Sequence, residues 1–209
     1  MSRIITLYLS ACSMIVLASC GQEVPPEQTA QPGQMAQTAS TSGVPEYQSA
    51  EMTSSAAGAT WKVPDRWTVQ EKRPMRIATY NVQPVSGDTE PGECAIFFFG
   101  TGEGGSVEMN LARWKDQFST DDGKEAELKQ TKSTINGMTV TTISISGTYL
   151  ASMGPMFQSG AEKKIGHKML GAIVTAPEGN VFIKFTGPEK TIDAAGNEFN
   201  DMIQSVREK

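Results

Sequence analysis

The dipeptide Asn136-Gly137 separates two extended runs of sequence, Lys129 to Ile135 and Met138 to Tyr149. A two-residue β-hairpin turn needs positive φ angles, and Asn followed by Gly is the pair that adopts them most readily. This is the strongest hairpin signal in the chain, and it predicts two antiparallel strands joined by a tight turn. An antiparallel sheet is therefore the first constraint on the fold.

Further strand signals lie on both sides of this hairpin. Pro177-Glu178-Gly179-Asn180 separates two more extended runs and predicts a second hairpin with a four-residue turn. Ala95 to Phe99 is an unbroken apolar run that suits a central strand. The remaining expected strands are Lys168 to Ala176, Val181 to Thr186, Met75 to Gln83, Thr60 to Val63, and Trp67 to Val69, the last pairing back on Thr60 to Val63.

Two segments carry apolar residues at helical spacing. The first follows Ser106, a candidate N-cap, and the second lies near the end of the chain with Thr191 or Asp193 as its cap. Ala151 to Gly166 has no clear period, and we expect a long mobile loop there. The apolar positions are Val107, Leu111, Trp114 and Phe118 in the first helix, and Ala195, Phe199, Met202, Ile203 and Val206 in the second.

These elements predict an α+β fold, with a twisted antiparallel sheet of about six to seven strands packed with two amphipathic helices. The sheet and helices occupy residues 59–209, which we expect to form a single globular domain. After Cys12 and Cys20 the only cysteine is Cys94, beside an apolar run. A buried small side chain is the expectation for Cys94, with a reactive or intermolecular thiol as the alternative.

The first residues have the pattern of an exported protein. Arg3 precedes an apolar run from Ile4 to Leu17, which is too short to span a membrane as a helix. The run ends in Ala18-Ser19-Cys20-Gly21, which resembles the lipobox of bacterial lipoproteins. That resemblance implies cleavage before Cys20, lipidation of Cys20, and an outer-membrane or periplasmic-face location if the cell has one.

Two alternatives to this N-terminus remain open. A rival lipobox at Leu9-Ser10-Ala11-Cys12 would leave a hydrophobic core of only about five residues, which is below the usual range. The apolar run could instead stay uncleaved as an anchor. We expect residues 1–19 to be the signal peptide and residues 20–58 to be the lipidated cysteine with a disordered tether. The tether has no Lys or Arg after Cys20 and is rich in Gln, Thr, Ser, Ala and Pro.

The charge of the chain limits its partners. The formal net charge is -5, with 18 Lys and Arg against 23 Asp and Glu. This balance argues against nucleic acid, which needs a basic face, and against an electrostatic grip on anionic lipid heads. We therefore expect contact with a membrane through the lipid anchor, and a protein or small ligand of the cell envelope as partner.

The segment Gly100 to Gly105 fits the dinucleotide-binding pattern G-x-G-x-x-G, and it lies between an expected strand and an expected helix. Hairpin strands follow the helix instead of repeated βαβ units, and Glu103 would place a carboxylate beside a pyrophosphate. The expectation is a turned connection whose glycines permit positive φ. Anion capture at the start of the following helix is the weaker functional alternative.

No catalytic, cofactor or metal site stands out. His167 is the only histidine, and no second soft metal ligand lies near it or Cys94 in the sequence. We expect His167 to be solvated or hydrogen-bonded rather than a catalytic base. Leu150-Ala151-Ser152-Met153-Gly154 misses the nucleophile-elbow motif, although a Ser/Lys pair distant in sequence stays open. The three tryptophans, Trp61, Trp67 and Trp114, are expected in the core rather than as a ligand-stacking set.

The order of elements, together with the opening Trp61-Lys62-Val63-Pro64-Asp65-Arg66-Trp67, the two hairpins and the closing helix, resembles the PsbP-like superfamily. The resemblance is architectural and covers residues 59–209. It implies an antiparallel sheet covered by helices, and a binding or assembly role rather than catalysis. The Gly100–Gly105 loop departs from the general pattern.

We therefore expect a lipid-anchored, non-catalytic binding or assembly module of the cell envelope. The alternatives are an envelope enzyme with a site that the sequence does not reveal, and a purely structural or stress-related surface protein. A deep polar pocket that gathers His167, a serine or several carboxylates would contradict the non-catalytic module. A flat sheet face with an apolar patch would favour the assembly module.

Overall fold

The computed structural model describes residues 54–152 and 161–209. Cys20, the expected signal peptide and most of the expected tether lie outside these residues. The described elements are β1 (Ser55–Ala56), β2 (Ala59–Thr60), β3 (Thr68–Val69), β4 (Ala78–Val82), β5 (Gly92–Phe97), α1 (Val107–Lys115), β6 (Phe118–Ser119), β7 (Leu128–Ile135), β8 (Met138–Ser152), β9 (Ala161–Ala176), β10 (Gly179–Pro188), α2 (Glu189–Ala194), α3 (Gly196–Gln204) and β11 (Arg207–Glu208).

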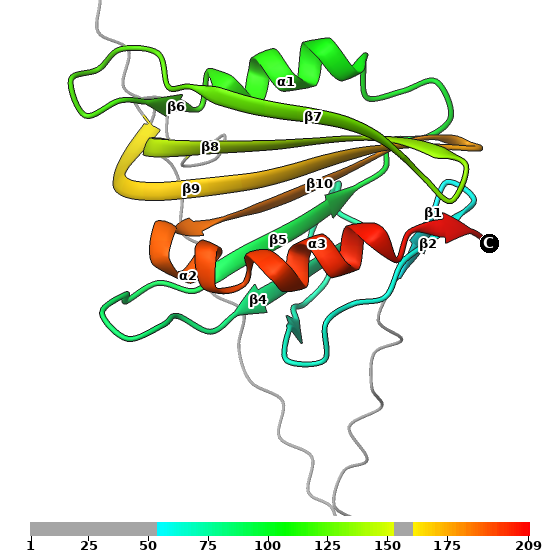
Figure 1. Ribbon diagram of the computed structural model, residues 1–209, viewed down its shortest axis with the longest axis horizontal. Helices are drawn as coiled ribbons and strands as arrows, with labels where there is room; N and C mark the ends of the chain where they lie inside the picture. The colour runs from blue at the N-terminus through cyan, green and yellow to red at the C-terminus, as the bar shows by residue number, and fades with distance from the viewer. Residues whose placement is uncertain (1–53, 153–160) are drawn as a thin grey trace, which may run out of the picture. The chain divides into compact units, whose positions relative to one another are not determined.

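Eight of these strands form one antiparallel sheet, which confirms the predicted α+β fold (Figure 1). The strand order is β3-β4-β5-β10-β9-β8-β6, and β7 also pairs with β8. The long strand β8 pairs with two short strands in turn. Its first half pairs with β7, and its residues Thr148 and Tyr149 pair with β6. The sheet therefore has slightly more strands than the six to seven expected.

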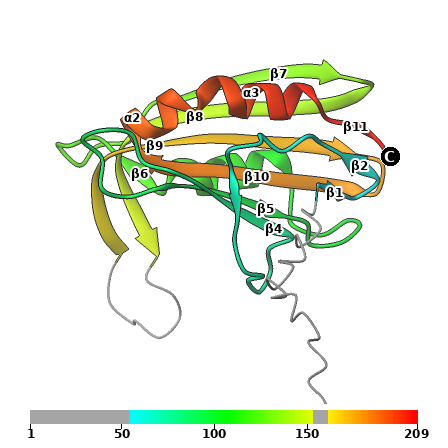
Figure 2. The same ribbon diagram turned by 90° about the horizontal axis from the view of Figure 1, so that it is seen from below.

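Side chains alternate across the sheet and form two hydrophobic cores. Figure 2 shows the helices α3 and α1 on opposite sides of the sheet. On β10, Val181, Ile183 and Phe185 pack in the core that contains α2 and α3. Phe182, which points the other way, packs in the core that contains α1. The helices thus cover opposite faces of one sheet, and each side of β10 is buried by a different layer.

The predicted hairpin at Asn136-Gly137 is confirmed. Ile135 pairs with Met138, so these two residues alone form the turn, and their φ angles are 46° and 85°. The second hairpin is also present, but it is tighter than expected. Gly179 already pairs with Ala176, so its loop is Pro177-Glu178 rather than four residues.

The helices differ from the expectation at their ends. Ser106 caps α1 as predicted, since its hydroxyl oxygen accepts a hydrogen bond from the Met109 amide. The helix ends at Lys115, however, and Phe118 lies in strand β6, where it pairs with Tyr149. Phe118 fits the helical period at i+11, but it reaches the same core as the helix from a strand.

The second helical segment is two helices rather than one. Pro188 and Ala195 precede α2 and α3, and neither helix has a side-chain cap. Thr191, expected as a cap, lies inside α2, where its amide and hydroxyl both donate to Asp88 at 3.0 and 2.7 Å. The acceptor for this backbone amide is thus a carboxylate of the distant β4–β5 connection, and not the side chain of a neighbouring residue.

Two extended segments pair differently from the expectation. Trp67 to Val69 does not turn back on Thr60 to Val63, because β3 pairs with β4 instead. Within the expected loop from Ala151 to Gly166, the described residues are strand, since β8 runs to Ser152 and β9 begins at Ala161. Residues 153–160 lie outside the described part.

A small second sheet joins the two ends of the domain. Its order is β1-β2-β11, and Lys209 also donates a backbone hydrogen bond to Gly58. Ala57, between β1 and β2, is buried in the core of the α3 face. Residues Ser55 to Gly58, assigned to the tether by the sequence analysis, therefore belong to the folded domain.

A β-bulge in the β8–β9 pair determines the side of the sheet on which Lys164 and His167 lie. Gly147 pairs with His167 and Tyr149 pairs with Lys164, so two residues of β9 oppose Thr148 alone. Without an extra residue, positions three apart on a strand point to opposite faces. The bulge instead brings Lys164 and His167 to the same side. Gly166 within it has φ 66°, in the left-handed region.

Replacing Gly166 by Ala tests the backbone requirement of the bulge. A Cβ at this position meets no atom within 4 Å, so the left-handed φ is the only strain introduced. We expect Gly166→Ala to lower the free energy of unfolding by about 1 kcal/mol in urea titrations.

Gly196→Ala is the matched control, because its Cβ also meets open space and Gly196 has no positive φ. Gly196 lies in α3, where Ala is the better helix former, so this variant should be unchanged or more stable. Equal destabilisation by the two substitutions would contradict the proposed role of the bulge.

Candidate functional site

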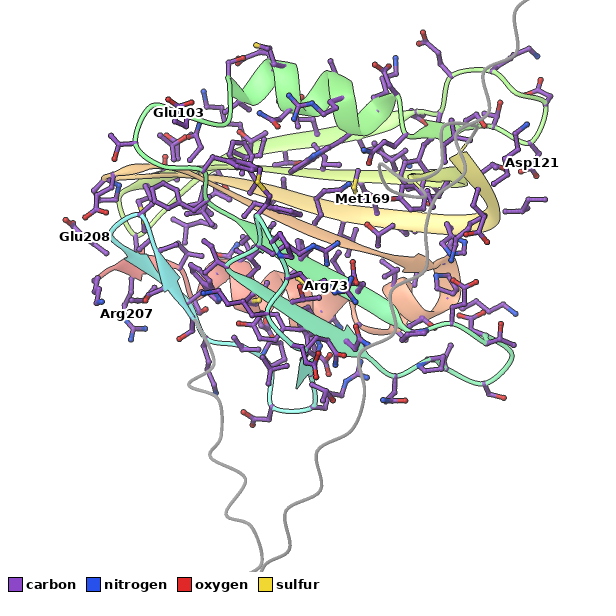
Figure 3. The ribbon with its side chains drawn as sticks, turned by 180° about the vertical axis from the view of Figure 1, so that it is seen from behind. Arg73, Glu103, Asp121, Met169, Arg207 and Glu208 are labelled. Carbon is purple, nitrogen blue, oxygen red and sulfur yellow. The ribbon has the colours of Figure 1, made fainter. Side chains whose placement is uncertain are left out.

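The helix α1 covers only part of its face of the sheet. Trp114 of α1 lies against Gly171 of β9, where a Cβ would come within 2.7 Å of the Trp114 ring. Beyond the helix, towards β4 and β5, the same face carries an open pocket of about 600 Å³. Figure 3 looks onto this side of the domain, with α1 at the top and Arg73 below it, over β5. The face is therefore apolar under the helix and polar in the pocket.

The register of the sheet explains which side chains enter the pocket. Lys184 of β10 lies between Ala95 of β5 and Gly171 of β9. One row further, Thr186 pairs with Glu93. Because both strand neighbours of Lys184 are small, its long side chain has room to lie along the sheet.

The charges of the pocket come from five segments of the chain. Among the described residues that line it are two carboxylates, four lysine and arginine side chains, and the only histidine. The positive groups outnumber the negative ones although the chain as a whole is acidic. These residues are Glu90 and Glu93; Arg73, Arg76, Lys164 and Lys184; and His167.

Glu93 is held by two arginines from the connection between β3 and β4. Arg73 and Arg76 each place a guanidinium nitrogen on a different carboxylate oxygen of Glu93, at 2.9 and 2.8 Å. Arg76 also donates to the Thr79 hydroxyl at 3.3 Å, and its guanidinium carbon lies 5.6 Å from the centre of the Phe97 ring. One carboxylate thus fixes two guanidinium groups at the rim of the pocket.

Glu90 holds the two side chains that the bulge brings together. Lys164 donates to its carboxylate at 2.5 Å, and Nε2 of His167 lies 3.8 Å from the same oxygen. The hydrogen bond from Lys164 lowers the pKa of Glu90, and Glu90 in turn raises the pKa of Lys164. His167 is 7% exposed, and its ring lies nearly parallel to that of Tyr149 with centroids 6.3 Å apart.

Lys184 differs from the other cations of the pocket. Its Nζ donates to the amide oxygen of Gln117 at 2.7 Å, and within the described residues it has no ion pair. The pKa of Lys184 is lowered to about 8, mainly by burial and next by the nearby Arg76, while Glu93 acts in the opposite direction. At neutral pH the largely buried ammonium of Lys184 therefore has a guanidinium nearby, and no described carboxylate forms an ion pair with the ammonium.

This arrangement can receive an oxyanion. A carboxylate or phosphate placed between Arg76 and Lys184 would accept charge-assisted hydrogen bonds from both. Tyr149 and Phe97 also line the pocket and offer aromatic surface to the rest of a ligand. Small-ligand pockets usually have a mainly apolar lining, whereas polar and charged side chains dominate this one, which favours a charged ligand.

His167 is placed in this pocket, but the features most prominent in the sequence are elsewhere. Cys20 lies outside the described residues. Cys94 is fully buried, and burial raises the pKa of its thiol. The expected setting of His167, a hydrogen-bonded side chain, is consistent with its contact to the Ile165 carbonyl oxygen at 3.2 Å. Trp61, Trp67 and Trp114 are all buried in the two cores.

The glycine-rich loop at 100–105 has a packing role. Gly104 has φ 86°, and a Cβ there would come within 2.8 Å of the rings of Phe99 and Phe182. Asn110 of α1 donates to the Gly104 carbonyl oxygen at 2.8 Å. Gly104 is thus required by the close approach of the loop to aromatic side chains. Gly100, Gly102 and Gly105 also have positive φ angles, as expected for a turned connection.

Sequence reasoning missed Lys184, both carboxylates and both arginines of the pocket. One signal was present. Lys184 interrupts the run Val181-Phe182-Ile183-Lys184-Phe185, whose four remaining residues are all large and apolar. A strand buried on both faces reads as a continuous apolar run, so a lysine in its middle marks a polar site. The arginines and Glu90 lie in connections, where charged residues carry no such signal.

Two features are absent from the described part of the chain. No group of three His, Cys, Asp or Glu side chains is placed there to hold a metal ion. None of its helices has the length and apolar character needed to cross a membrane.

Comparisons with known proteins give structural likenesses only. No protein-family model matches the chain, and no curated protein matches it. The solution structure of cyanobacterial PsbP (CyanoP) from Synechocystis sp. PCC 6803 has a TM-score of 0.46 at 11% identity, over 73% of this chain and 88% of that one. A crystal structure of PA94, a protein of unknown function from Pseudomonas aeruginosa, has a TM-score of 0.40 at 10% identity, over 67% and 95%. The functional argument therefore rests on the residues of this chain.

Replacing Lys184 by Met tests its buried charge. The folded-state pKa of about 8 is below the ordinary value of 10.5, so the unfolded chain binds more protons between these pH values and stability rises with pH. We expect Lys184→Met to be more stable than the wild type at pH 7, by up to about 3 kcal/mol. The difference should shrink as the pH rises from about 8 to about 10.5.

Denaturant titrations at several pH values measure this difference. Lys190→Met is the control, because Lys190 is exposed and the same substitution there removes no buried charge. Gln117 is only partly buried, so water can replace its lost donor in the Lys184 variant. A pH-independent difference for Lys184→Met would show that the ammonium is not destabilised in the folded protein.

Proposed function

We propose that this protein is a non-catalytic binding module whose ligand is a small organic oxyanion, a carboxylate or a phosphate, held in the pocket beside α1. The observation that carries the proposal is the position of Lys184. A largely buried ammonium next to Arg76, with only an amide oxygen as its hydrogen-bond partner, is stabilised when a negative group enters the pocket.

The neighbouring charges support the same ligand class. Glu93 neutralises Arg73 and Arg76 only in part, and Glu90 is engaged by Lys164. A ligand oxyanion would therefore meet a surplus of positive charge in a partly desolvated site, where electrostatic attraction is stronger than in water. The aromatic lining favours a ligand with a flat or apolar body.

Binding is a better account of the site than turnover. A general base works best with a pKa near the working pH, but the hydrogen bond from Lys164 lowers the pKa of Glu90. Glu93 is committed to two guanidinium groups. The pocket gathers His167 and two carboxylates, as the enzyme alternative requires, yet both carboxylates are arranged as ion-pair partners.

We further propose that the domain is exported and anchored at the cell envelope through a lipidated Cys20. The support is the lipobox-like ending of the N-terminal apolar run. Such an anchor would place the pocket in an extracytoplasmic compartment, where the ligand is a solute or a fragment of an envelope component. A protein partner stays part of this proposal only as a second contact outside the pocket.

Calorimetric titration with benzoate and phenyl phosphate tests the oxyanion site. Benzamide is the ligand control, because it has nearly the shape of benzoate without the charge. We expect at least one anion to bind and benzamide to bind more weakly by about tenfold or more, as loss of a charge-assisted hydrogen bond implies.

The variant Arg76→Gln should weaken anion binding by about tenfold for the same reason, while Glu93 keeps Arg73 as its partner. Arg207→Gln removes one positive charge at an exposed position of β11 and should leave the affinity nearly unchanged. If both variants weaken binding equally, or benzamide binds as well as benzoate, the site does not recognise an oxyanion.

Metabolic labelling with a tagged fatty acid tests the anchor. Cys20→Ala should abolish incorporation into the full chain, because the acylated thiol is removed. Cys12→Ala is the matched control, since it removes the rival cysteine and should keep the label. Labelling that persists in Cys20→Ala, or is lost in Cys12→Ala, would refute Cys20 as the lipidated residue.

A further inference from the structure

Lys184 is placed as a reactive amine as well as a cation. It lies at the middle of β10 between Ala95 and Gly171, and its Nζ opens into the pocket with one hydrogen bond, to Gln117. On the β5 side the small neighbour Ala95 also lines the pocket, whereas on the β9 side the Trp114 ring lies against Gly171. Arg73 and Arg76 line the same pocket, so a ligand whose oxyanion is bound by these arginines can direct its other end toward Lys184.

The surroundings of Lys184 favour the uncharged amine, which is the nucleophilic form. Burial is the largest cause, Arg76 is the next, and Arg113 of α1 acts in the same direction, while Glu93 opposes them. Lys164 and His167 of β9 and Tyr149 of β8 line the same pocket.

Other lysines lack this setting. Glu90 raises the pKa of Lys164, and Glu125 raises the pKa of Lys115, so both remain protonated at pH values where Lys184 loses its proton. Since its pKa is about 8, Lys184 has a substantial neutral fraction near that pH.

We propose that Lys184 captures an aldehyde that also carries an oxyanion, as a reversible imine. The inference rests on the proposed oxyanion site and names the reactive class of its ligand. The amine nitrogen attacks the carbonyl carbon, a carbon–nitrogen double bond replaces the carbon–oxygen one, and the carbonyl oxygen leaves as water with the two amine protons. No oxidant or reductant takes part, and the imine is hydrolysed by the reverse path.

The test is reductive trapping with 4-formylbenzoate and sodium cyanoborohydride on the full chain at pH 7.5, read out by peptide mass spectrometry. We expect Lys184 to be modified at least about tenfold faster than exposed lysines such as Lys190, because its neutral fraction is larger. Benzaldehyde, which lacks the carboxylate, should label Lys184 more slowly than 4-formylbenzoate. The rate at Lys184 should rise as the pH approaches about 8, because the neutral fraction of its amine grows.

The comparison between lysines is made within the wild-type chain, so it does not depend on the folding of a variant. Lys184→Arg keeps the positive charge but removes the primary amine, so it should lose the adduct. Benzoate binding with no preference for Lys184 in the trapping would overturn the imine and leave the oxyanion site intact. Fast labelling of Lys184 by both aldehydes alike, without benzoate binding, would overturn the oxyanion site and the ligand class proposed here.

Discussion

The antiparallel pairing of β10 with both β5 and β9 holds the rest of the domain in place. Each residue of β10 from Phe182 to Thr186 has a partner on both sides, so the backbone of this strand is satisfied along its length. Its side chains alternate between the core of α2 and α3 and the core of α1. A change in register by one residue would exchange the two cores, which is why this pairing cannot slip.

The pocket follows from the unequal lengths of the covering layers. The nine-residue helix α1 covers one part of its face, and the remaining part is lined by β5, β10 and the charged connections around them. Lys184 lies in the central strand at the border of this uncovered part. An ammonium there is costly for folding, and this cost is the physical basis of the proposed oxyanion ligand.

The bulge in β9 adds the second half of the pocket. It turns Lys164 to the side of His167, so both side chains meet Glu90, which comes from the β4–β5 connection. Asp88 in the same connection accepts the hydrogen bonds of Thr191 at the start of α2. One connection thus supplies a carboxylate to the pocket on one face and an acceptor to the helix on the other.

Local sequence was enough for elements whose conformation depends on neighbouring residues. Asn136-Gly137 determined its turn because few residue pairs accept positive φ, and Ser106 determined the start of α1 because its hydroxyl accepts a nearby amide. Phe118 and Thr191 could not be placed in this way. Phe118 satisfies a helical and a strand period alike, and the partner of Thr191 is 103 residues away in sequence.

By itself the sequence determined the α+β class, the two hairpins, the apolar character of the cores, and the lipobox-like N-terminus that motivates the proposed anchor. The tertiary structure alone decided the site. Arg76, Glu90, Lys164 and Lys184 come from four segments, and their meeting depends on strand order, register and one bulged residue. These are long-range properties of the backbone, which no local pattern of residue types encodes.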